Sequence, residues 1–192
     1  MNLGLLFACG LLAVTTVSPA AAADGYFLQA DIGGQTQGVV ASASRGDLSF
    51  GLNLSDYEGG RLGTLNATYA FALPGTATLR AGPTIGFTRD DGGNRETEFG
   101  IRSSFDRWSA TSFGSTYFLG EASTPQRSWF LLSQVTLAPS NIGIELSRGG
   151  SENYRETTLA VQRRVGAGPV SLRLGYKLSS EELFAGFSIN TF

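Results

Sequence analysis

Residues 169–178 read PVSLRLGYKL, a run in which apolar side chains alternate strictly with small or polar ones. A period of two residues is typical of a β-strand, because successive side chains on a strand point to opposite faces. The apolar positions are Val170, Leu172, Leu174, Tyr176 and Leu178, and the others are Ser171, Arg173, Gly175 and Lys177. Residues 169–178 are therefore predicted to form a strand with one apolar and one polar face.

The same alternation recurs along the chain after residue 24, in segments separated by residue types that favour turns. The segments span residues 26–33, 37–43, 47–54, 61–73, 76–89, 96–105, 109–119, 127–137, 141–148, 154–165, 169–178 and 183–192. Residues 37–43 are either a separate strand or a bent continuation of the first one. The pattern therefore predicts 11 or 12 strands and no helix.

The composition argues against several classes of function. The chain has 192 residues, a length typical of one domain, with 26 Gly and only 16% charged residues. A net charge of −2 offers no basic surface for nucleic acid, so no nucleic-acid partner is expected. The chain contains no His, the usual general base and a common metal ligand. We therefore expect no enzymatic activity, no catalytic residue, no metal and no cofactor.

The first 23 residues are predicted to be a secretory signal peptide. They contain no charged side chain, and an apolar core at residues 5–14 precedes a small-residue stretch at residues 18–23. That apolar core is shorter than the roughly 20 residues that a membrane-spanning helix needs. Cleavage after Ala23 would remove the only cysteine, Cys9, and leave residues 24–192 as one all-β domain.

Alternation alone fits both a soluble β-sandwich and a membrane β-barrel, and two further observations favour the barrel. The face opposite the apolar side chains is rich in Gly, Ser and Thr, and Lys177 is the only lysine, as expected for a polar lumen. Aromatic residues lie near the ends of the segments, where amphipathic rings prefer the membrane–water boundary. They are Tyr69, Phe71, Phe87, Phe105, Trp108, Tyr117, Trp129, Tyr154 and Phe184.

The turns fall into two alternating classes. Residues 73–75, 138–141 and 166–169 are short and uncharged, whereas residues 90–94, 149–153 and 179–182 contain acidic side chains. Successive turns of an up-and-down barrel lie on alternate sides of the membrane, so this sorting predicts an all-β, antiparallel transmembrane barrel. If both termini lie in the periplasm, the strand number is even. That condition gives 12 strands with a hairpin near residues 33–37, with 10 strands as the alternative.

The leader, the alternating segments over residues 26–192, the aromatic residues and the terminal Phe192 resemble bacterial outer-membrane β-barrel proteins of the small porin-like class. The resemblance implies a cell outer membrane location in a Gram-negative envelope and contact with outer-membrane lipid. It also implies that the barrel-assembly machinery reads the last strand at Phe192. Phe192 is out of phase with the apolar positions of residues 183–189. Either a bulge near Asn190 shifts the register or Phe192 lacks that signal role.

Seven charged residues are expected to face the lumen by their phase. They are Arg80, Arg102, Arg173, Lys177, Glu98, Glu145 and Asp31. In one interpretation the four basic residues form a lining that favours anionic or polar solutes. In the other, the carboxylates pair with the arginines and order the interior. The sequence supports these two interpretations equally.

The predicted function is passive passage of small polar or anionic solutes through a narrow lumen, selected by size and by the four basic residues. A barrel of about 12 strands is narrower than the 16–18-stranded porins, whose lumen is an aqueous channel. Side chains can close such a narrow lumen, so the first alternative is a non-conducting structural or partner-binding outer-membrane barrel. The second alternative is a soluble secreted β-sandwich.

Overall fold

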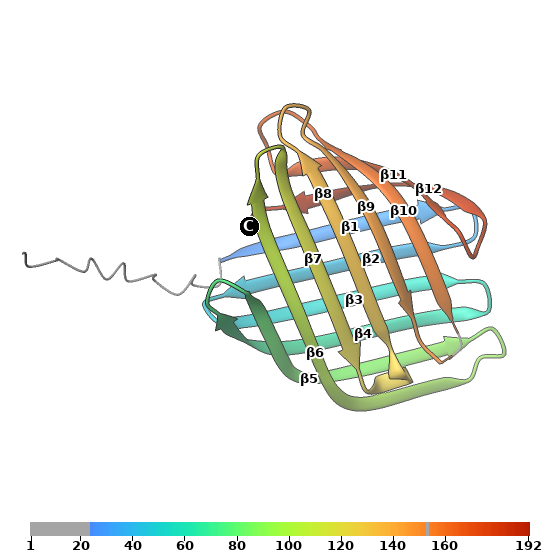
Figure 1. Cartoon of the computed structure of the whole chain (residues 1–192). Helices are drawn as coiled ribbons and strands as arrows, with labels where there is room; N and C mark the ends of the chain where they lie inside the picture. Colours follow the sequence, from blue (N-terminus) through green and yellow to red (C-terminus); the bar gives the residue numbers. More distant parts are fainter. Residues whose placement is uncertain (1–23, 153) are drawn as a thin grey trace, which may run out of the picture.

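The computed structural model describes residues 24–152 and 154–192, which form a closed barrel of twelve antiparallel strands (Figure 1). The strands are β1 (Gly25–Gly33), β2 (Gln37–Arg45), β3 (Leu48–Tyr57), β4 (Gly60–Leu73), β5 (Ala77–Asp90), β6 (Arg95–Thr111), β7 (Gly114–Ser123), β8 (Trp129–Leu137), β9 (Ile142–Gly150), β10 (Arg155–Arg164), β11 (Val170–Lys177) and β12 (Glu182–Asn190). A short 3-10 helix, η1 (Pro125–Arg127), lies between β7 and β8. Within the described residues, no helix is long and apolar enough to cross a membrane.

The prediction of twelve strands, with a hairpin between β1 and β2, is confirmed, and the closed barrel excludes the β-sandwich alternative. Each strand pairs with its neighbours in the chain, and β1 pairs with β12 from Phe27 opposite Asn190 to Gly33 opposite Phe184. Closure gives the first and last strands a partner inside the sheet, as lipid requires because it offers no hydrogen bonds. The predicted signal peptide, residues 1–23, lies outside the described residues.

The barrel has two walls whose strands cross. In Figure 1, β1–β5 run across the view, whereas β6–β10 run steeply over them. The longest strand, β6, belongs to both walls. Arg95 to Ile101 pair only with β5, Arg102 to Asp106 pair with both β5 and β7, and Arg107 to Thr111 pair only with β7. The bend in β6 therefore joins the two walls.

The apolar face of the strands points outward. Phe99 and Leu183 are 83% and 75% exposed, and most of the other large exposed apolar residues alternate with interior positions along their strands. Val40 and Trp108 are exceptions, because they are exposed but share the phase of the interior positions. The interior face otherwise carries mainly small and polar residues, among them the buried Ser188. A mainly apolar exterior around a mainly polar interior is typical of a barrel surrounded by lipid.

Both described chain ends lie at one end of the barrel, here named the terminal end, and the opposite end is named the far end. Thr191 donates its backbone N–H to the carbonyl oxygen of Tyr26 at 3.1 Å. The three uncharged turns follow β4, β8 and β10 and lie at the terminal end. The three acidic turns follow β5, β9 and β11 and lie at the far end. The two classes of turn are therefore on opposite sides, although Asp47 also lies at the terminal end.

One predicted gap between strands is wrong. The segments 96–105 and 109–119 left residues 106–108 outside any strand, but β6 continues to Thr111 and β7 begins at Gly114. Two adjacent charged residues, Asp106 and Arg107, are more typical of a turn than of a strand interior. In the barrel, Asp106 instead takes an interior position and pairs with Arg80, so its charge is neutralised within the sheet.

The aromatic residues expected at the membrane boundary divide between the two faces. Tyr69, Phe71, Phe87, Phe105 and Trp129 take outward positions, Trp108, Tyr117 and Phe184 take interior positions, and Tyr154 lies in a loop. At the terminal end, outward rings contact one another, with centroids 5.2 Å apart for Tyr69 and Phe71. The interior group contradicts the expectation, whereas the outward group lies on the face that the expectation requires.

The last strand contains no bulge. Asn190 pairs with Phe27 in unbroken register, and the bond from Thr191 to Tyr26 continues the ladder. The register-shift alternative is therefore wrong, and Phe192 shares the phase of the interior positions. Its ring covers Gly25, where a Cβ atom would lie 2.7 Å from the ring.

Candidate functional site: the barrel interior

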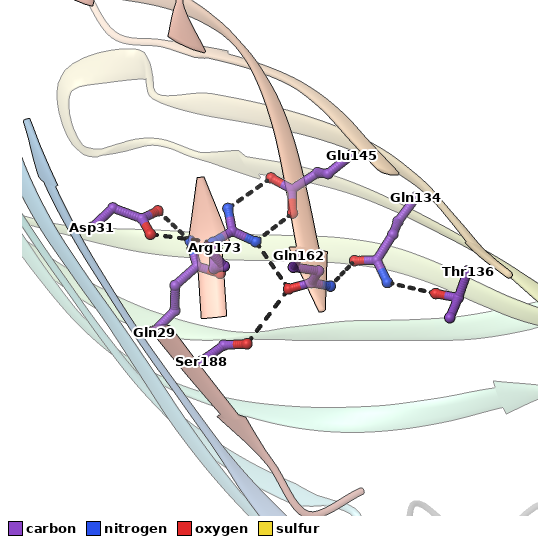
Figure 2. A network of polar contacts seen from close by, with 8 residues as sticks. All are labelled: Gln29, Asp31, Gln134, Thr136, Glu145, Gln162, Arg173 and Ser188. Atoms are coloured by element: carbon purple, nitrogen blue, oxygen red, sulfur yellow. Dashed lines mark hydrogen bonds and ion pairs between the residues drawn. The ribbon is translucent and has the colours of Figure 1, made fainter. Parts of the chain in front are cut away.

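Arg173 on β11 forms the most buried ion pairs of the described interior, and its side chain is only 2% exposed. Its Nη1 and Nη2 donate to the two carboxylate oxygens of Glu145 on β9, at 2.9 and 3.3 Å. Its Nε donates to Oδ1 of Asp31 on β1 at 3.1 Å (Figure 2). A two-pronged arginine–carboxylate contact fixes both side chains in orientation, so the guanidinium is held rather than free to move.

These partners of Arg173 lie two strands away, and small residues make the contacts possible. Gly186 on β12 stands between Arg173 and Asp31 in the register of the sheet. A Cβ atom at Gly186 would lie 2.1 Å from Oδ1 of Asp31, so only glycine leaves room for the contact. On the other side, the buried Ala160 stands opposite Glu145 and leaves that carboxylate open to Arg173.

Amide side chains extend the cluster around the wall. Arg173 donates to Oε1 of Gln162 at 3.2 Å, and Gln162 donates from Nε2 to Oε1 of Gln134 at 2.9 Å. Gln134 in turn donates to the hydroxyl of Thr136 at 3.0 Å. At the opposite end of the chain of contacts, Gln29 donates to Asp31 at 2.7 Å. Figure 2 shows this network, named here the Arg173 network, which links β8, β9, β10, β11 and β1.

A second set of ion pairs lies on the inner faces of β5, β6 and β7. Arg80 on β5 pairs with Asp106 on β6, and Arg102 on β6 pairs with Glu121 on β7. Both pairs join diagonal positions on adjacent strands, which are within reach of long side chains. The side chains of Arg80 and Arg102 are 24% and 20% exposed, so water reaches them more than it reaches Arg173.

Lys177 lies near the far end and is also paired. Its ammonium group is 3.5 Å from Oε1 of Glu182 and contacts the hydroxyl of Thr36. The same carboxylate accepts the backbone N–H of Gln35 at 2.7 Å. The ammonium also lies 5.7 Å from the ring centroid of Phe184, within the range of a cation–π contact. Lys177 therefore ties β11 and β12 to the first hairpin.

Glu98 has a different partner from the other predicted lining residues. Its carboxylate accepts the backbone N–H of Gln126 at 2.8 Å. Gln126 and Pro125 belong to η1, and both are buried because their loop folds inward over Gly86. Among the described residues, no basic side chain lies within 4.0 Å of Glu98. Glu98 thus holds the η1 loop at the far end and does not pair with an arginine.

Aromatic rings narrow the same end. Tyr57, at the end of β3, stacks on Tyr154, which precedes β10, with ring centroids 4.8 Å apart and planes at 25°. Strands β3 and β10 are not neighbours in the barrel, so this contact crosses the far opening. The backbone N–H of Glu152 also donates to the carbonyl oxygen of Gln126 at 3.1 Å. Two loops and one strand end therefore meet over the far opening.

The inner faces of β2, β3 and β4 carry no charged side chain. Its interior positions include Ser42, Ser44, Ser49, Gly51, Asn53, Ser55, Thr64, Asn66 and Thr68. These side chains are short and uncharged. The interior face of β2–β4 therefore offers hydroxyl and amide groups to whatever occupies the lumen.

Comparison with known proteins supports the fold. No protein-family model matches the chain, and no curated protein matches it in sequence. A solved structure described as a KdgM porin matches with a TM-score of 0.51 at 10% sequence identity, over 86% of this chain and 98% of the other. By its fold, the chain is a porin-like barrel. At this identity the likeness concerns the fold alone.

All seven predicted lining residues of this porin-like barrel take interior positions. The structure joins Arg173 to Glu145 and Asp31, but it places Arg80, Arg102 and Lys177 with carboxylates that the sequence analysis missed. The missed partners are Asp106, Glu121 and Glu182. Asp106 and Glu121 lay just outside predicted strands. Extending the alternation by one residue for Asp106 and by two for Glu121 places both in the interior.

Proposed function

We propose that this protein is an outer-membrane channel that passes small polar solutes by diffusion and catalyses no reaction. The observation that supports the proposal is the contrast between an apolar exterior and an interior covered by polar side chains held in fixed positions. In this orientation the terminal end faces the periplasm and the far end faces outward. The predicted leader would direct export, and assembly through the last strand at Phe192 belongs to the same proposal.

The proposed mechanism is exclusion by size combined with hydrogen bonding along one wall. The Arg173 network and the ion pairs of β5–β7 hold their long side chains against their own walls. A solute would pass along β2–β4, exchanging hydrogen bonds with water for bonds with partly exposed interior groups such as the Ser42 hydroxyl and the Asn53 amide. Binding of this kind is weak and repeated, which is what conduction requires.

The ion pairs argue against selection of anions. Arg80, Arg102, Arg173 and Lys177 each lie beside a carboxylate, so none presents an uncompensated positive charge to the lumen. Among the described interior positions, Arg164 at the terminal rim is the basic residue without a carboxylate within 4.0 Å. We therefore propose uncharged polar solutes. Glu98 and Glu156 also take interior positions and have no basic side chain of the described chain within 4.0 Å, so we expect any ion selectivity to favour cations.

Single-channel recording in a planar bilayer tests this proposal. The folded barrel should give stable conductance steps with a modest preference for cations. Arg102→Gln leaves Glu121 unpaired and should strengthen this preference, whereas Glu121→Gln leaves Arg102 unpaired and should weaken or reverse it. These opposite shifts provide a matched pair, because each variant removes one member of the same contact. Identical selectivity in both variants would contradict a lumen at this position.

A non-conducting barrel is the second candidate function. The specific observation in its favour is the far end, where Tyr57 stacks on Tyr154 and the η1 loop folds inward. Absence of conductance from protein shown to be folded and inserted, by protease protection and heat-dependent gel mobility, would favour this structural or partner-binding role. Conductance that appears only in Tyr57→Ala would instead identify a closed state of a channel.

A further inference from the structure

Three arginines form a row on the outside of the barrel at the far end. Arg61 on β4 stands opposite Arg89 on β5, and Arg89 stands opposite Arg95 on β6. All three are exposed and share the outward phase of Phe87 and Phe99. We propose that this arginine row binds the phosphate of a phosphorylated lipid in the membrane leaflet at the far end. This inference rests on insertion of the barrel in a membrane and not on conduction.

The register makes the row electrostatically unfavourable by itself. Adjacent strands are about 4.8 Å apart, so the side chains of directly opposite residues are close neighbours. Like charges at such positions destabilise a sheet. The sequence nevertheless places arginine at three successive positions across β4, β5 and β6. An anion between the guanidinium groups removes this repulsion, and phosphate oxygens match the paired N–H donors of arginine.

Acidic residues flank the row, but among the residues that the structure describes two of its three arginines pair with none of them. Asp56 on β3 pairs with Arg61, with Oδ2 2.9 Å from Nε. Asp90 is engaged within its own turn, where its carboxylate accepts two bonds from Asn94, each 2.8 Å long. Over residues 24–152 and 154–192, neither Arg89 nor Arg95 has a carboxylate within 4.0 Å. Two guanidinium groups of the row therefore remain available to a ligand.

The row lies at the level expected for lipid headgroups. Outward positions on β5 are apolar from Ala77 to Phe87, a distance of about 33 Å along the strand at 3.3 Å per residue. Strands of membrane barrels are tilted by about 45°, so this run covers roughly the 25 Å height of a lipid-facing band. Arg89 is the next outward position after Phe87. The arginine row thus begins where the apolar band ends, at the depth of phosphate groups.

The terminal end lacks such an arrangement. Its outward arginines are Arg45, Arg107 and Arg163, and each stands opposite an apolar residue on a neighbouring strand. Their register partners are Leu48, Phe118 and Leu172. These arginines are isolated, so each can interact with a headgroup only as a single charge. The clustering at the far end therefore indicates a ligand in that leaflet.

The experiment compares two double variants of the purified barrel in mixed micelles. Arg89→Gln with Arg95→Gln removes the free guanidinium groups of the row, and Arg107→Gln with Arg163→Gln removes the same charge at the terminal end. Retained lipid is counted by native mass spectrometry with bis-phosphorylated lipid A as the probe. An arginine near a membrane surface changes binding about 5-fold, so the row variant should bind roughly 30-fold more weakly. The control should bind lipid A clearly more strongly than the row variant, because its two arginines stand apart and cannot share one phosphate.

Three outcomes would overturn the proposal. The first is equal binding of lipid A by the two double variants, and the second is equal binding of lipid A and its dephosphorylated form by the unmodified barrel. The third is complete displacement of the lipid by excess inorganic phosphate, which would indicate a site for free anions. Thermal unfolding in detergent without phosphorylated lipid distinguishes a lipid-binding role of the arginine row from a contribution to the stability of the fold. There the row variant should unfold at an equal or higher temperature, and a clear loss of stability would also contradict the proposal.

Discussion

The two charged regions of the interior contain the same kinds of side chain but use them differently. In the Arg173 network, one arginine that is 2% exposed contacts carboxylates two strands away on both sides. On β5–β7, Arg80 and Arg102 are partly exposed, and each contacts one carboxylate on an adjacent strand. The first region links distant strands into one unit, whereas the second consists of two independent local pairs.

The difference follows from the residues between the charges. Gly186 and Ala160 remove the side chains that would separate Arg173 from its partners. On β5–β7, Ser104 stands between Arg80 and Glu121 in the register and keeps a side chain there, and each arginine instead contacts a diagonal carboxylate on an adjacent strand. The absence of a side chain at Gly186 therefore distinguishes the Arg173 network from the pairs on β5–β7.

Removal of the buried arginine should have the largest effect. Arg173→Met leaves the carboxylates of Glu145 and Asp31 buried without a cation, which costs about 3–5 kcal/mol of unfolding free energy. Arg102→Met is the matched control in the other region, where water reaches the remaining Glu121, and should cost about 1 kcal/mol. Urea unfolding in lipid vesicles, followed by Trp fluorescence, measures both values. Equal losses would mean that the two regions do not differ energetically.

A single methyl group should disrupt the same network from the neighbouring strand. In Gly186→Ala the added Cβ would lie 2.1 Å from Oδ1 of Asp31 and 2.4 Å from the carbonyl oxygen of Ala30, so one of them must move. Overpacking of this kind costs about 1–3 kcal/mol. Gly168→Ala, where nothing lies within 4 Å, should be nearly neutral in the same urea titration. A neutral result at Gly186 would show that the wall has room to adjust.

The smallest expected effect concerns the aromatic contact over the far opening. Tyr57 and Tyr154 belong to non-neighbouring parts of the barrel, like the partners of Arg173, but they are not charged. A double-mutant cycle with Tyr57→Ala and Tyr154→Ala should give a coupling energy of about 1 kcal/mol. The outward pair Phe105 and Phe118, on adjacent strands with centroids 6.3 Å apart, provides the comparison. A coupling of zero between the tyrosines would mean that the stack contributes nothing to closing the far end.

The number of strands and the direction of their side chains, inward or outward, can be predicted from the sequence because lipid and lumen favour opposite residue types at alternating positions. The pattern of residues 169–178 coincides with β11 apart from one residue at each end. Local composition was misleading where a charged residue sits inside a strand, as with Asp106. Residues 33–37 are ambiguous in sequence, because a three-residue connection and a bend have similar composition.

Partner identity in the interior was less predictable. The seven lining positions followed from phase alone, but the pairing of Arg80 with Asp106 depends on the register between β5 and β6. The partners of Arg173 depend in addition on an intervening glycine that has no charge of its own. Gly186 stands opposite Arg173 on one neighbouring strand and opposite Asp31 on the other. Once the register is known, a glycine between two opposite charges predicts that they can meet.

Closure between β1 and β12 also sets an order of events during assembly. Arg173 and Asp31 are 142 residues apart in sequence, and Tyr26 and Thr191 are 165 apart. Contacts of such separation form late, because the chain between them must first be brought together. The bond between Arg173 and Asp31 can therefore form only when the first strand synthesised meets the last. Until then the carboxylate of Asp31 has no arginine partner. Formation of the ion pair between Asp31 and Arg173 therefore indicates that the barrel is complete.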